Sequence, residues 1–465
     1  MPLWLLALVA LFALQVSSDW YTTPDSVRYL SIARHIAAGM GIADLDNTAP
    51  CFPPGYPLLV SAGFAFSERP FLAIAVIHVG LVLVLACATW AWSRRWLGAG
   101  APWATALVLV NASLWYHFRR PLSELAFMTA AMVAVDLLNA LREGSAPTGR
   151  RALQIAGAAA LLAALPLIRE VGVVFAVGFA AVSLLDARSG RLPRGTAPSL
   201  VVSLAACGIG ATALFLAYDV WAARSGATPA AIHLASLLEP PVDHARWTSE
   251  ALLHRIGELA RLLVPGGLHN RPLEEWLDPR IAVYAPVTFV VLIGWWTLAK
   301  RRDVLAVTAP FYVGIYLVWG FEAGTRYMLP LLPLVAGSLW CALAFLERAR
   351  TPAFAALIAI HLTVSLYGWR AHDAPAARAC TSSWPTVEAL VRAIPPGARV
   401  STSGEVPECI WSTLSFVLDR GVASDPAPWP GATSSEWRVE PGGRPAVANA
   451  EVVAQAGGFR VLRRR

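Results

Sequence analysis

Long apolar segments recur along almost the whole chain and constrain its fold more than any other feature. Each comes close to the roughly 20 residues that an α-helix needs to cross the hydrocarbon core of a bilayer. Hydrophobic residues make up 57% of the 465 residues and charged residues 14%, which excludes a soluble domain of this size. Eleven candidate segments cover residues 3–17, 71–92, 102–116, 122–141, 152–168, 171–185, 198–221, 281–299, 304–320, 327–346 and 353–368.

These segments are expected to be helices, because hydrocarbon offers no hydrogen-bond partner to a free backbone amide and the runs are too long for barrel strands. We therefore predict an all-α polytopic membrane protein with about eleven transmembrane helices. The first segment could alternatively be a cleaved signal peptide. It lacks a basic stretch before it, and Ala13-Leu14-Gln15 makes a poor cleavage site, so a retained span is favoured.

Basic residues cluster in alternate short connections and predict the orientation of the chain. The clusters are Arg94 and Arg95; Arg142, Arg150 and Arg151; Arg188, Arg191 and Arg194; Lys300, Arg301 and Arg302; and Arg348 and Arg350. By the positive-inside rule these connections face the cytoplasm, which puts the amino terminus inside and the carboxyl-terminal region outside. These anchors largely account for the formal net charge of +7. No basic stripe interleaved with aromatic residues supports nucleic-acid binding.

Four arginines lie on the predicted outer side, where the positive-inside rule gives them no role: Arg119, Arg120, Arg169 and Arg326. Each lies near an acidic residue in the sequence, and these acids are Glu124, Glu170 and Glu322. Charges at this depth tend to face an interior cavity, pair with one another and mark a substrate path. The alternative is that they snorkel or form structural ion pairs at helix ends.

The first outer loop, residues 18–70, contains a helix predicted from Asp25 to Ala38, which Pro24 precedes and Gly39 ends. At the start of that helix the dipole and the free amides would stabilise the ionised form of Asp25, as a proton-accepting carboxylate requires. The alternative is that Asp25 is only an N-cap. Further along, Pro53-Pro54-Gly55-Tyr56-Pro57 predicts a rigid turn towards the next span.

A second outer loop, residues 222–280, contains an amphipathic pattern. Leu252, Ile256, Leu259 and Leu263 recur at helical spacing, opposite Arg255, Glu258 and Arg261. This pattern predicts a helix that lies in the membrane interface. The histidines of the loop are scattered without the close spacing of metal ligands.

Beyond residue 369 the sequence becomes polar and rich in proline and glycine. Short strands are predicted over 399–401 and 415–418, a helix over 386–394 and a hairpin over 452–461. We therefore divide the chain into a transmembrane domain, residues 1–368, and a small extracytoplasmic α/β domain, residues 369–465.

The carboxyl-terminal domain holds two of the six cysteines, Cys380 and Cys409. An oxidising compartment would allow a disulfide between them, whereas Cys87, Cys207 and Cys341 fall within apolar segments and are expected to be inert. Cys51 is left over. The sequence leaves the pairing open.

Four motifs in this order carry a resemblance to a known family. They are the Asp25-x-x-x-Tyr29 loop, the Pro53–Pro57 turn, Arg169-Glu170-Val171-Gly172, and Arg326-Tyr327-Met328-Leu329-Pro330-Leu331-Leu332-Pro333. Together they resemble the polytopic GT-C glycosyltransferases, in the branch typified by lipid A aminoarabinose transferases and protein O-mannosyltransferases. The resemblance covers essentially the whole membrane part of the chain.

The resemblance implies transfer of a hexosyl or pentosyl group from a polyprenyl-phosphate-linked donor, with inversion at the anomeric carbon. The acceptor would be an extracytoplasmic glycolipid, polysaccharide or protein at a bacterial-type plasma (inner) membrane. Asp25 takes the place of the family's catalytic acid, as the general base or as the group that orients the acceptor, and Arg326 takes that of the contact to the carrier phosphate. Ser26 stands where relatives often have a second acid, which weakens assignment to the protein mannosyltransferases.

Physical chemistry supports further site residues. A lipid-phosphate leaving group gains negative charge as the glycosidic bond breaks, and fixed guanidinium groups stabilise that charge. Arg169, Arg119, Arg120 and Tyr327 are therefore grouped with Arg326 as candidate phosphate-binding residues, Glu124 as a second catalytic acid, and Tyr29 and Tyr56 as substrate-loop residues. Some relatives use a divalent cation, and the resemblance leaves one open here; the sequence contains no clear ligand set, so we leave the metal unassigned and expect no other cofactor.

The competing hypothesis is a transporter or flippase for an anionic lipid-linked substrate, with the same arginines lining a passage. Such folds tend to show internal repeats and broken helices near the membrane midplane. The two halves of the sequence show no repeat, and the outer charges gather at one surface. A third hypothesis, an assembly partner without catalytic activity, stays open.

Overall fold

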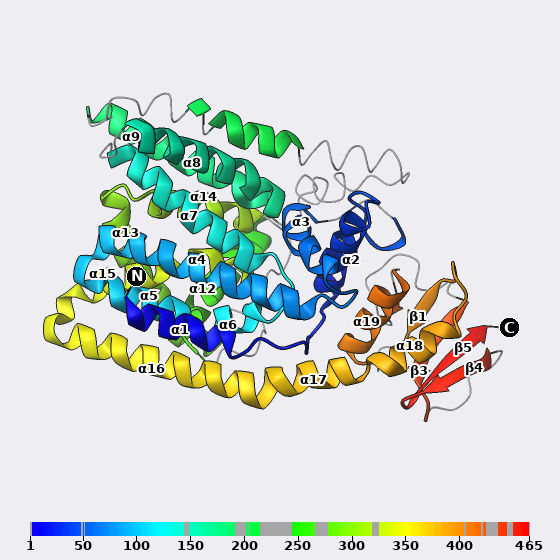
Figure 1. The fold of residues 1–465 in the computed structure, drawn as a ribbon. Coiled ribbons are helices and arrows are strands. Elements are labelled where there is room, and N and C mark those ends of the chain that lie inside the picture. Colours follow the sequence, from blue (N-terminus) through cyan, green and yellow to red (C-terminus); the bar gives the residue numbers. More distant parts are fainter. Residues whose placement is uncertain are drawn as a thin grey trace.

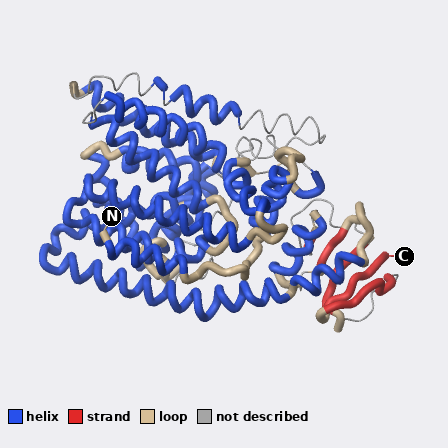
Figure 2. The backbone as a smooth tube through the Cα atoms, viewed as in Figure 1, coloured by secondary structure: helices blue, strands red, loops and turns tan. Residues whose placement is uncertain are grey.

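The computed structural model of the protein consists of a helical bundle followed by a small β-sheet at the carboxyl-terminal end (Figure 2). It describes residues 2–47, 50, 52–143, 148–190, 201–202, 204–213, 244–265, 278–318, 325–403, 406–419, 422–424, 436–443 and 450–464. Most of the second outer loop, Cys51 and Glu322 therefore lie outside the described residues.

Helices occupy the predicted apolar segments. They are α1 (Leu3–Ala13), α4 (Phe71–Leu97), α5 (Ala101–Val110), α6 (Ala112–Phe118), α7 (Glu124–Glu143), α8 (Thr148–Ile168), α9 (Val173–Arg188), α13 (Ile281–Lys300), α14 (Val304–Val318), α15 (Leu332–Ala342) and α16 (Arg350–Gly368). The segment 198–221 is described only in part, with a helix over Leu204–Ala213. Within the described ranges, six helical runs are long and apolar enough to cross a membrane, and five further apolar helices are shorter. The helical, apolar architecture is confirmed, while the number of eleven spans stays a prediction.

One predicted span is interrupted. Residues 102–116 form two helices, α5 and α6, separated at Asn111. The Asn111 side chain accepts a hydrogen bond from the amide of Ser113 at 3.0 Å, and so caps α6. It also donates to the carbonyl of Leu262 at 2.6 Å. An asparagine competes with the backbone for hydrogen bonds, which explains the break.

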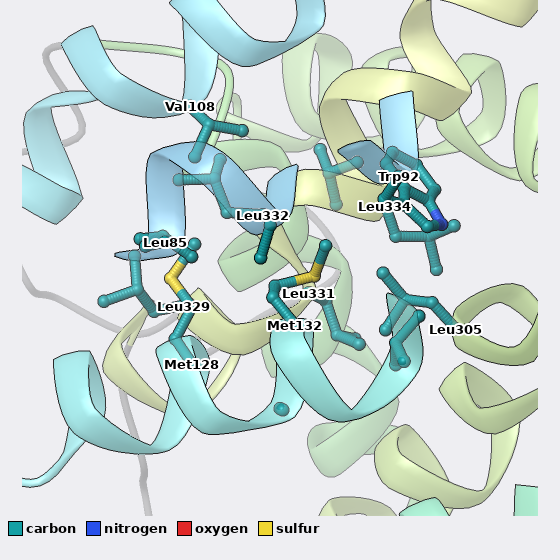
Figure 3. Packing of buried hydrophobic residues seen from close by; sticks show 14 of the residues in the cluster. Leu85, Trp92, Val108, Met128, Met132, Leu305, Leu329, Leu331, Leu332 and Leu334 are labelled. Carbon is teal, nitrogen blue, oxygen red and sulfur yellow. The ribbon is translucent and has the colours of Figure 1, made fainter. Parts of the chain in front are cut away.

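The bundle packs around a dry core. Figure 3 shows buried leucine, valine, methionine and tryptophan side chains that meet from α4, α5, α7, α14, the turn Leu329–Leu331 and the start of α15. Helices α13 and α15 approach closely because residue 294 is glycine, where an added Cβ would lie 1.7 Å from the carbonyl oxygen of Ser338. Small residues at such crossings are typical of membrane helix packing.

The helix of the second outer loop, α12 (His244–Arg261), differs from the prediction. Arg255, Glu258 and Arg261 are buried, whereas Leu252 is exposed. The charged face turns inward because it finds partners there. Arg255 pairs with Glu258 at 2.5 Å, and its guanidinium lies 5.9 Å from the ring centre of Tyr316.

The carboxyl-terminal part begins within a continuous helical run. Helix α16 passes through residues 369–373 into α17 (Ala374–Ser382), so the predicted boundary at residue 369 falls inside this run. In Figure 1 the run extends along one side of the bundle as far as the sheet. The remaining elements are α18 (Trp384–Arg392), β1 (Val400–Thr402), α19 (Glu408–Leu418), β2 (Ala423–Ser424), β3 (Trp437–Pro441), β4 (Ala450–Ala456) and β5 (Phe459–Arg464).

The strands form one mixed sheet in the order β2-β1-β3-β5-β4. Strand β1 is parallel to β2 and β3, and β5 is antiparallel to β3 and β4. The hairpin predicted over 452–461 and the helix predicted over 386–394 are confirmed. The strand predicted over 415–418 is wrong, because these residues end α19, whose Ile410 and Leu414 are buried at helical spacing.

Helix α19 docks on α2 (Pro24–Ala37), the helix of the first outer loop. Asp419, which follows α19, makes the contact. One oxygen of its carboxylate accepts a hydrogen bond from the Ser31 hydroxyl at 2.7 Å and lies 2.7 Å from Arg34 Nη2, and the other lies 2.5 Å from Nε2 of His35. The hydrogen bond to Asp419 raises the pKa of His35. Burial alone would raise the pKa of Asp419, but the hydrogen bonds from His35 and Ser31 lower it to about 2.

Candidate functional site

Asp25 lies in the first turn of α2 and points to an arginine rather than to its own helix. Thr23 is the N-cap, because its hydroxyl accepts from the amide of Ser26 at 3.2 Å, and Pro24 is the first helical residue. Asp25 is therefore not needed as a cap. Its Oδ2 lies 2.6 Å from Nη1 of Arg326, and both side chains are 30% exposed.

Glu124, the first residue of α7, connects two arginines from distant parts of the chain. Its Oε1 accepts from Nη1 of Arg169 at 2.9 Å and lies 3.8 Å from Nε of Arg326. The side chain of Glu124 is 3% exposed and that of Arg169 10%. Arg169 therefore pairs across the bundle, although Glu170 is its neighbour in sequence. The extended backbone of Arg169 directs its side chain inward, just before the chain tightens into the turn Glu170–Gly172.

Tyr327 packs beside both guanidinium groups. Its ring centre lies 4.6 Å from the Cζ of Arg169 and 4.9 Å from that of Arg326. The Nη2 of Arg326 also donates to the Tyr327 hydroxyl at 3.2 Å. These contacts fix the two carboxylate-bound guanidinium groups in place beside the tyrosine ring.

The two tyrosines predicted as substrate-loop residues take different positions. Tyr29 lines the cavity between Asp25, Glu124 and the two arginines, and its hydroxyl lies 3.0 Å from the Ser123 hydroxyl. Tyr56 lies behind it, where its ring meets that of Tyr29 edge-on at 5.3 Å and its hydroxyl lies 3.0 Å from Nε2 of His78. Tyr56 therefore supports the site without lining it.

These residues surround a partly open cavity, whose empty space, including the part that is open to solvent, is about 610 Å³. We call it the central chamber; it is lined by Asp25, Tyr29, Phe52, Pro53, Glu124, Arg169, Glu170, Val171, Ile315, Tyr316, Arg326 and Tyr327. Tyr316 and Ile315 from α14 were not anticipated from the sequence, because nothing in an apolar helix marks the residues that will border a cavity.

Two glycines let the motifs meet. A Cβ on Gly55 would lie 2.7 Å from the carbonyl oxygen of Leu167, and one on Gly172 would lie 2.4 Å from the carbonyl carbon of Leu165. Both therefore pack against the last turn of α8, directly before Arg169. The Pro53–Pro57 turn and the Arg169–Gly172 turn are thus held together by close backbone contact that a larger residue would block.

The arginines of the chamber stay charged. Burial alone would lower the pKa of Arg169, but Glu124 opposes it and the pKa is raised. Burial acts likewise on Arg326, where Tyr327, Glu124 and Asp25 together raise the pKa. His117 lies beside this cluster and was missed from the sequence. Burial lowers its pKa to about 4, so it is neutral at pH 7.

Arg119 and Arg120 are not brought to the central chamber. They line a separate space, the peripheral pocket, together with Asp19, Tyr21 and Asp373. Because α6 ends at Phe118, Arg120 folds back over its own helix: its guanidinium lies 3.3 Å from the ring centre of Tyr116 and donates to the carbonyl of Tyr116 at 2.8 Å. Arg119 and Arg120 therefore do not contact Glu124, although they lie close to it in the sequence.

The described residues show no ligand set for a divalent cation. Within the described part of the chain, no three His, Cys, Asp or Glu side chains gather as a metal site. Asp25 and Glu124 are both engaged by guanidinium groups, whereas a metal needs several free carboxylate oxygens.

Comparison with solved structures identifies proteins of the same fold. No protein-family model and no curated protein matches the sequence. The structure, however, resembles ArnT from Cupriavidus metallidurans with a TM-score of 0.58 at 13% identity, over 99% of this chain and 97% of that chain. The chain shares the fold of this ArnT structure.

The same ArnT bound to undecaprenyl phosphate aligns equally well. An archaeal oligosaccharyltransferase, AglB from Archaeoglobus fulgidus in complex with an inhibitory peptide and a dolichol-phosphate, aligns with a TM-score of 0.55 at 14% identity, over 94% of this chain and 69% of that chain. The resemblance inferred from the four motifs is thus confirmed at the level of the fold.

Proposed function

We propose that this protein transfers a sugar from a polyprenyl-phosphate-linked donor to an extracytoplasmic acceptor, with inversion at the anomeric carbon. The proposal places the amino terminus in the cytoplasm and the carboxyl-terminal part outside a bacterial-type plasma membrane. One observation carries it: a carboxylate and two fixed guanidinium groups, from three separate elements, meet in one chamber. Support comes from the similar ArnT and AglB structures, which hold undecaprenyl phosphate and a dolichol-phosphate.

Arg326 and Arg169 would hold the carrier phosphate. As the glycosidic bond breaks, negative charge grows on the phosphate, and two permanently charged guanidinium groups in a largely buried site stabilise it. Glu124 serves best as a positioning residue rather than as a second acid, because its Oε1 faces both arginines. Its Oε2 has no hydrogen-bond partner among the described residues and can accept one from a sugar hydroxyl.

Asp25 would be the general base that takes the proton of the acceptor hydroxyl. Without substrate it is paired with Arg326 at 2.6 Å. A donor phosphate that binds Arg326 competes for this pairing and releases the carboxylate towards the acceptor. The base is then freed only when the donor is in place, which favours transfer to the acceptor over reaction of the donor with water.

The decisive experiment starts from the lipid-linked sugar that accumulates in cells lacking the protein. Transfer of that sugar is measured with purified protein in liposomes, for the wild type and Asp25→Asn. We expect transfer to fall by about 10²- to 10⁴-fold, the usual contribution of a general base, at an unchanged level of protein in the membrane.

Asp19→Asn is the matched control, because Asp19 borders the peripheral pocket and not the chamber; its transfer should stay within about threefold of wild type. Undiminished transfer by Asp25→Asn would refute the assignment of the base. Movement of the lipid-linked sugar across the bilayer without any transfer would instead favour the flippase hypothesis.

A further inference from the structure

Two cysteines lie together where α17 meets α19. Cys380, in the last turn of α17, is fully buried. Its Sγ lies 3.7 Å from the carbonyl oxygen of Cys409 and 3.8 Å from the hydroxyl of Thr22. Cys409, in the first turn of α19, is half-buried. Two residues that are 29 positions apart, on two different helices, are thus in direct contact.

The two thiols also influence each other's ionisation. A hydrogen bond from Cys409 lowers the pKa of Cys380 to about 7, and the same contact raises the pKa of Cys409. Near neutral pH a large fraction of Cys380 is therefore thiolate, while Cys409 keeps its proton. Thiolates are the attacking groups in thiol–disulfide exchange, and an attacking thiol works best with a pKa close to the ambient pH.

We propose that Cys380 and Cys409 form a disulfide that fastens the carboxyl-terminal region to the end of the membrane helices. The oxidant is a disulfide-carrying thiol oxidoreductase of the cell envelope. The Cys380 thiolate attacks one sulfur of the oxidant's disulfide and forms a mixed disulfide. In the mixed disulfide Cys380 no longer carries the negative charge that holds the proton on Cys409, so the Cys409 thiol deprotonates, attacks Cys380 Sγ and displaces the oxidant's thiolate. Two electrons and the two thiol protons pass to the oxidant, which leaves as a dithiol.

The bond would brace the segment that carries Asp25. The chain between α1 and α2 packs on α17, where the amide of Trp20 donates to the Thr381 hydroxyl at 3.2 Å. Helix α19 holds the other end of α2 through Asp419. A covalent link between α17 and α19 therefore fixes the two surfaces on which the first outer loop rests. The inference rests on the proposed function in one respect, the outer location of the carboxyl-terminal region.

The first test maps thiols in the full-length protein. Membranes are denatured with N-ethylmaleimide present, and peptides are analysed before and after reduction. We expect one linked peptide pair containing Cys380 and Cys409, and two fewer reactive thiols before reduction than the six present after it. Recovery of both cysteines as alkylated peptides before reduction, or of either one linked to a different cysteine, would overturn the proposal.

The second test measures the consequence by thermal unfolding in detergent with and without a phosphine reductant. Reduction should lower the Tm of the wild type by roughly 5 °C, as loss of a disulfide predicts for a chain of this size. Cys341→Ser, in α15, should respond as the wild type does, whereas Cys380→Ser and Cys409→Ser should no longer respond to reductant.

A wild-type Tm that reductant does not change would show that the pair only packs, and would overturn the inference. Should Cys380→Ser fail to fold, Cys409→Ser and the wild type still decide the question. Neither test measures sugar transfer, so failure of the disulfide is distinguishable from failure of the proposed function.

Discussion

The central chamber and the peripheral pocket both contain two arginines at the predicted outer ends of helices, yet the structure uses them differently. In the chamber, Arg169 and Arg326 meet carboxylates that come from other elements, α2 and α7. In the peripheral pocket, Arg120 stacks on Tyr116 of its own helix and comes no closer than 4.0 Å to Asp373. A cluster of arginines in the sequence is therefore a poor indicator of a site. A better indicator is whether each arginine pairs with a carboxylate from a different element of the fold.

Burial does not explain the difference. The Arg120 side chain is 9% exposed, close to the 10% of Arg169. What differs is the partner. The aromatic ring beside Arg120 carries no negative charge, whereas the buried carboxylate beside Arg169 pairs with the cation and fixes its position. A phosphate entering the chamber finds guanidinium groups already oriented. A phosphate entering the peripheral pocket must first compete with Asp19 and Asp373 for the two arginines, and Arg120 is also bound to Tyr116.

The strongest test of the difference between the two pockets removes Glu124, the carboxylate that Arg169 and Arg326 share. Glu124→Gln leaves Arg169 and the nearby Arg326 without their buried carboxylate, so we expect a loss of about 3–5 kcal/mol in the free energy of unfolding, as for other broken buried pairs. Asp373→Asn, whose contact spans 4.0 Å, should cost about 1 kcal/mol or less. Thermal unfolding in detergent measures both. Equal losses would mean that the two pockets are alike.

The next test compares one arginine from each pocket by the same substitution. Arg326→Lys keeps the charge but removes the planar fork, so we expect transfer to fall about 10²-fold. Arg119→Lys should change transfer by less than about threefold. Initial rates over a series of donor concentrations separate donor binding from turnover. If Arg119→Lys loses as much as Arg326→Lys, the peripheral pocket belongs to the substrate path.

The smallest effect concerns pH and the docking of α19 on α2, because the arginines of the chamber stay charged. The pKa of His35 is raised above its usual 6.5, so its contribution is complete below pH 6.5 and is lost as the pH rises through the raised pKa. Asp419, with its pKa lowered to about 2, contributes above 3.8 and loses its contribution as the pH falls towards 2. The docking contact should therefore be strongest between about pH 4 and pH 6.5.

We expect its weakening above that range to cost about 1 kcal/mol or less, since Asp419 is one-third exposed and Arg34 still faces it. Limited proteolysis of the carboxyl-terminal region as a function of pH measures the effect, and His35→Gln should flatten the profile. A wild-type profile that is already flat between pH 5 and pH 8 would show that His35 does not titrate in this range.

Several elements of the site were predictable because local chemistry constrains them. Asp25 follows a proline at a helix start, and Arg326 precedes a run of prolines that forces irregular backbone before α15. The pairing of Glu124 with Arg169 was not predictable, because it depends on how α7 and α8 pack. Nor was the inward charged face of α12, because an amphipathic pattern shows that two faces differ without showing which one has partners.

The amino-acid sequence by itself determined the apolar, helical class of this protein, the positions of most of its helices and the identity of the acid in the first turn of α2. These follow from hydropathy, from the rigidity of proline and from the cost of unpaired amides in hydrocarbon. Tertiary structure alone decided which arginines share the chamber with that acid and which cysteines touch. Such contacts join residues far apart in the chain, and helix packing, rather than any local preference, sets their distances.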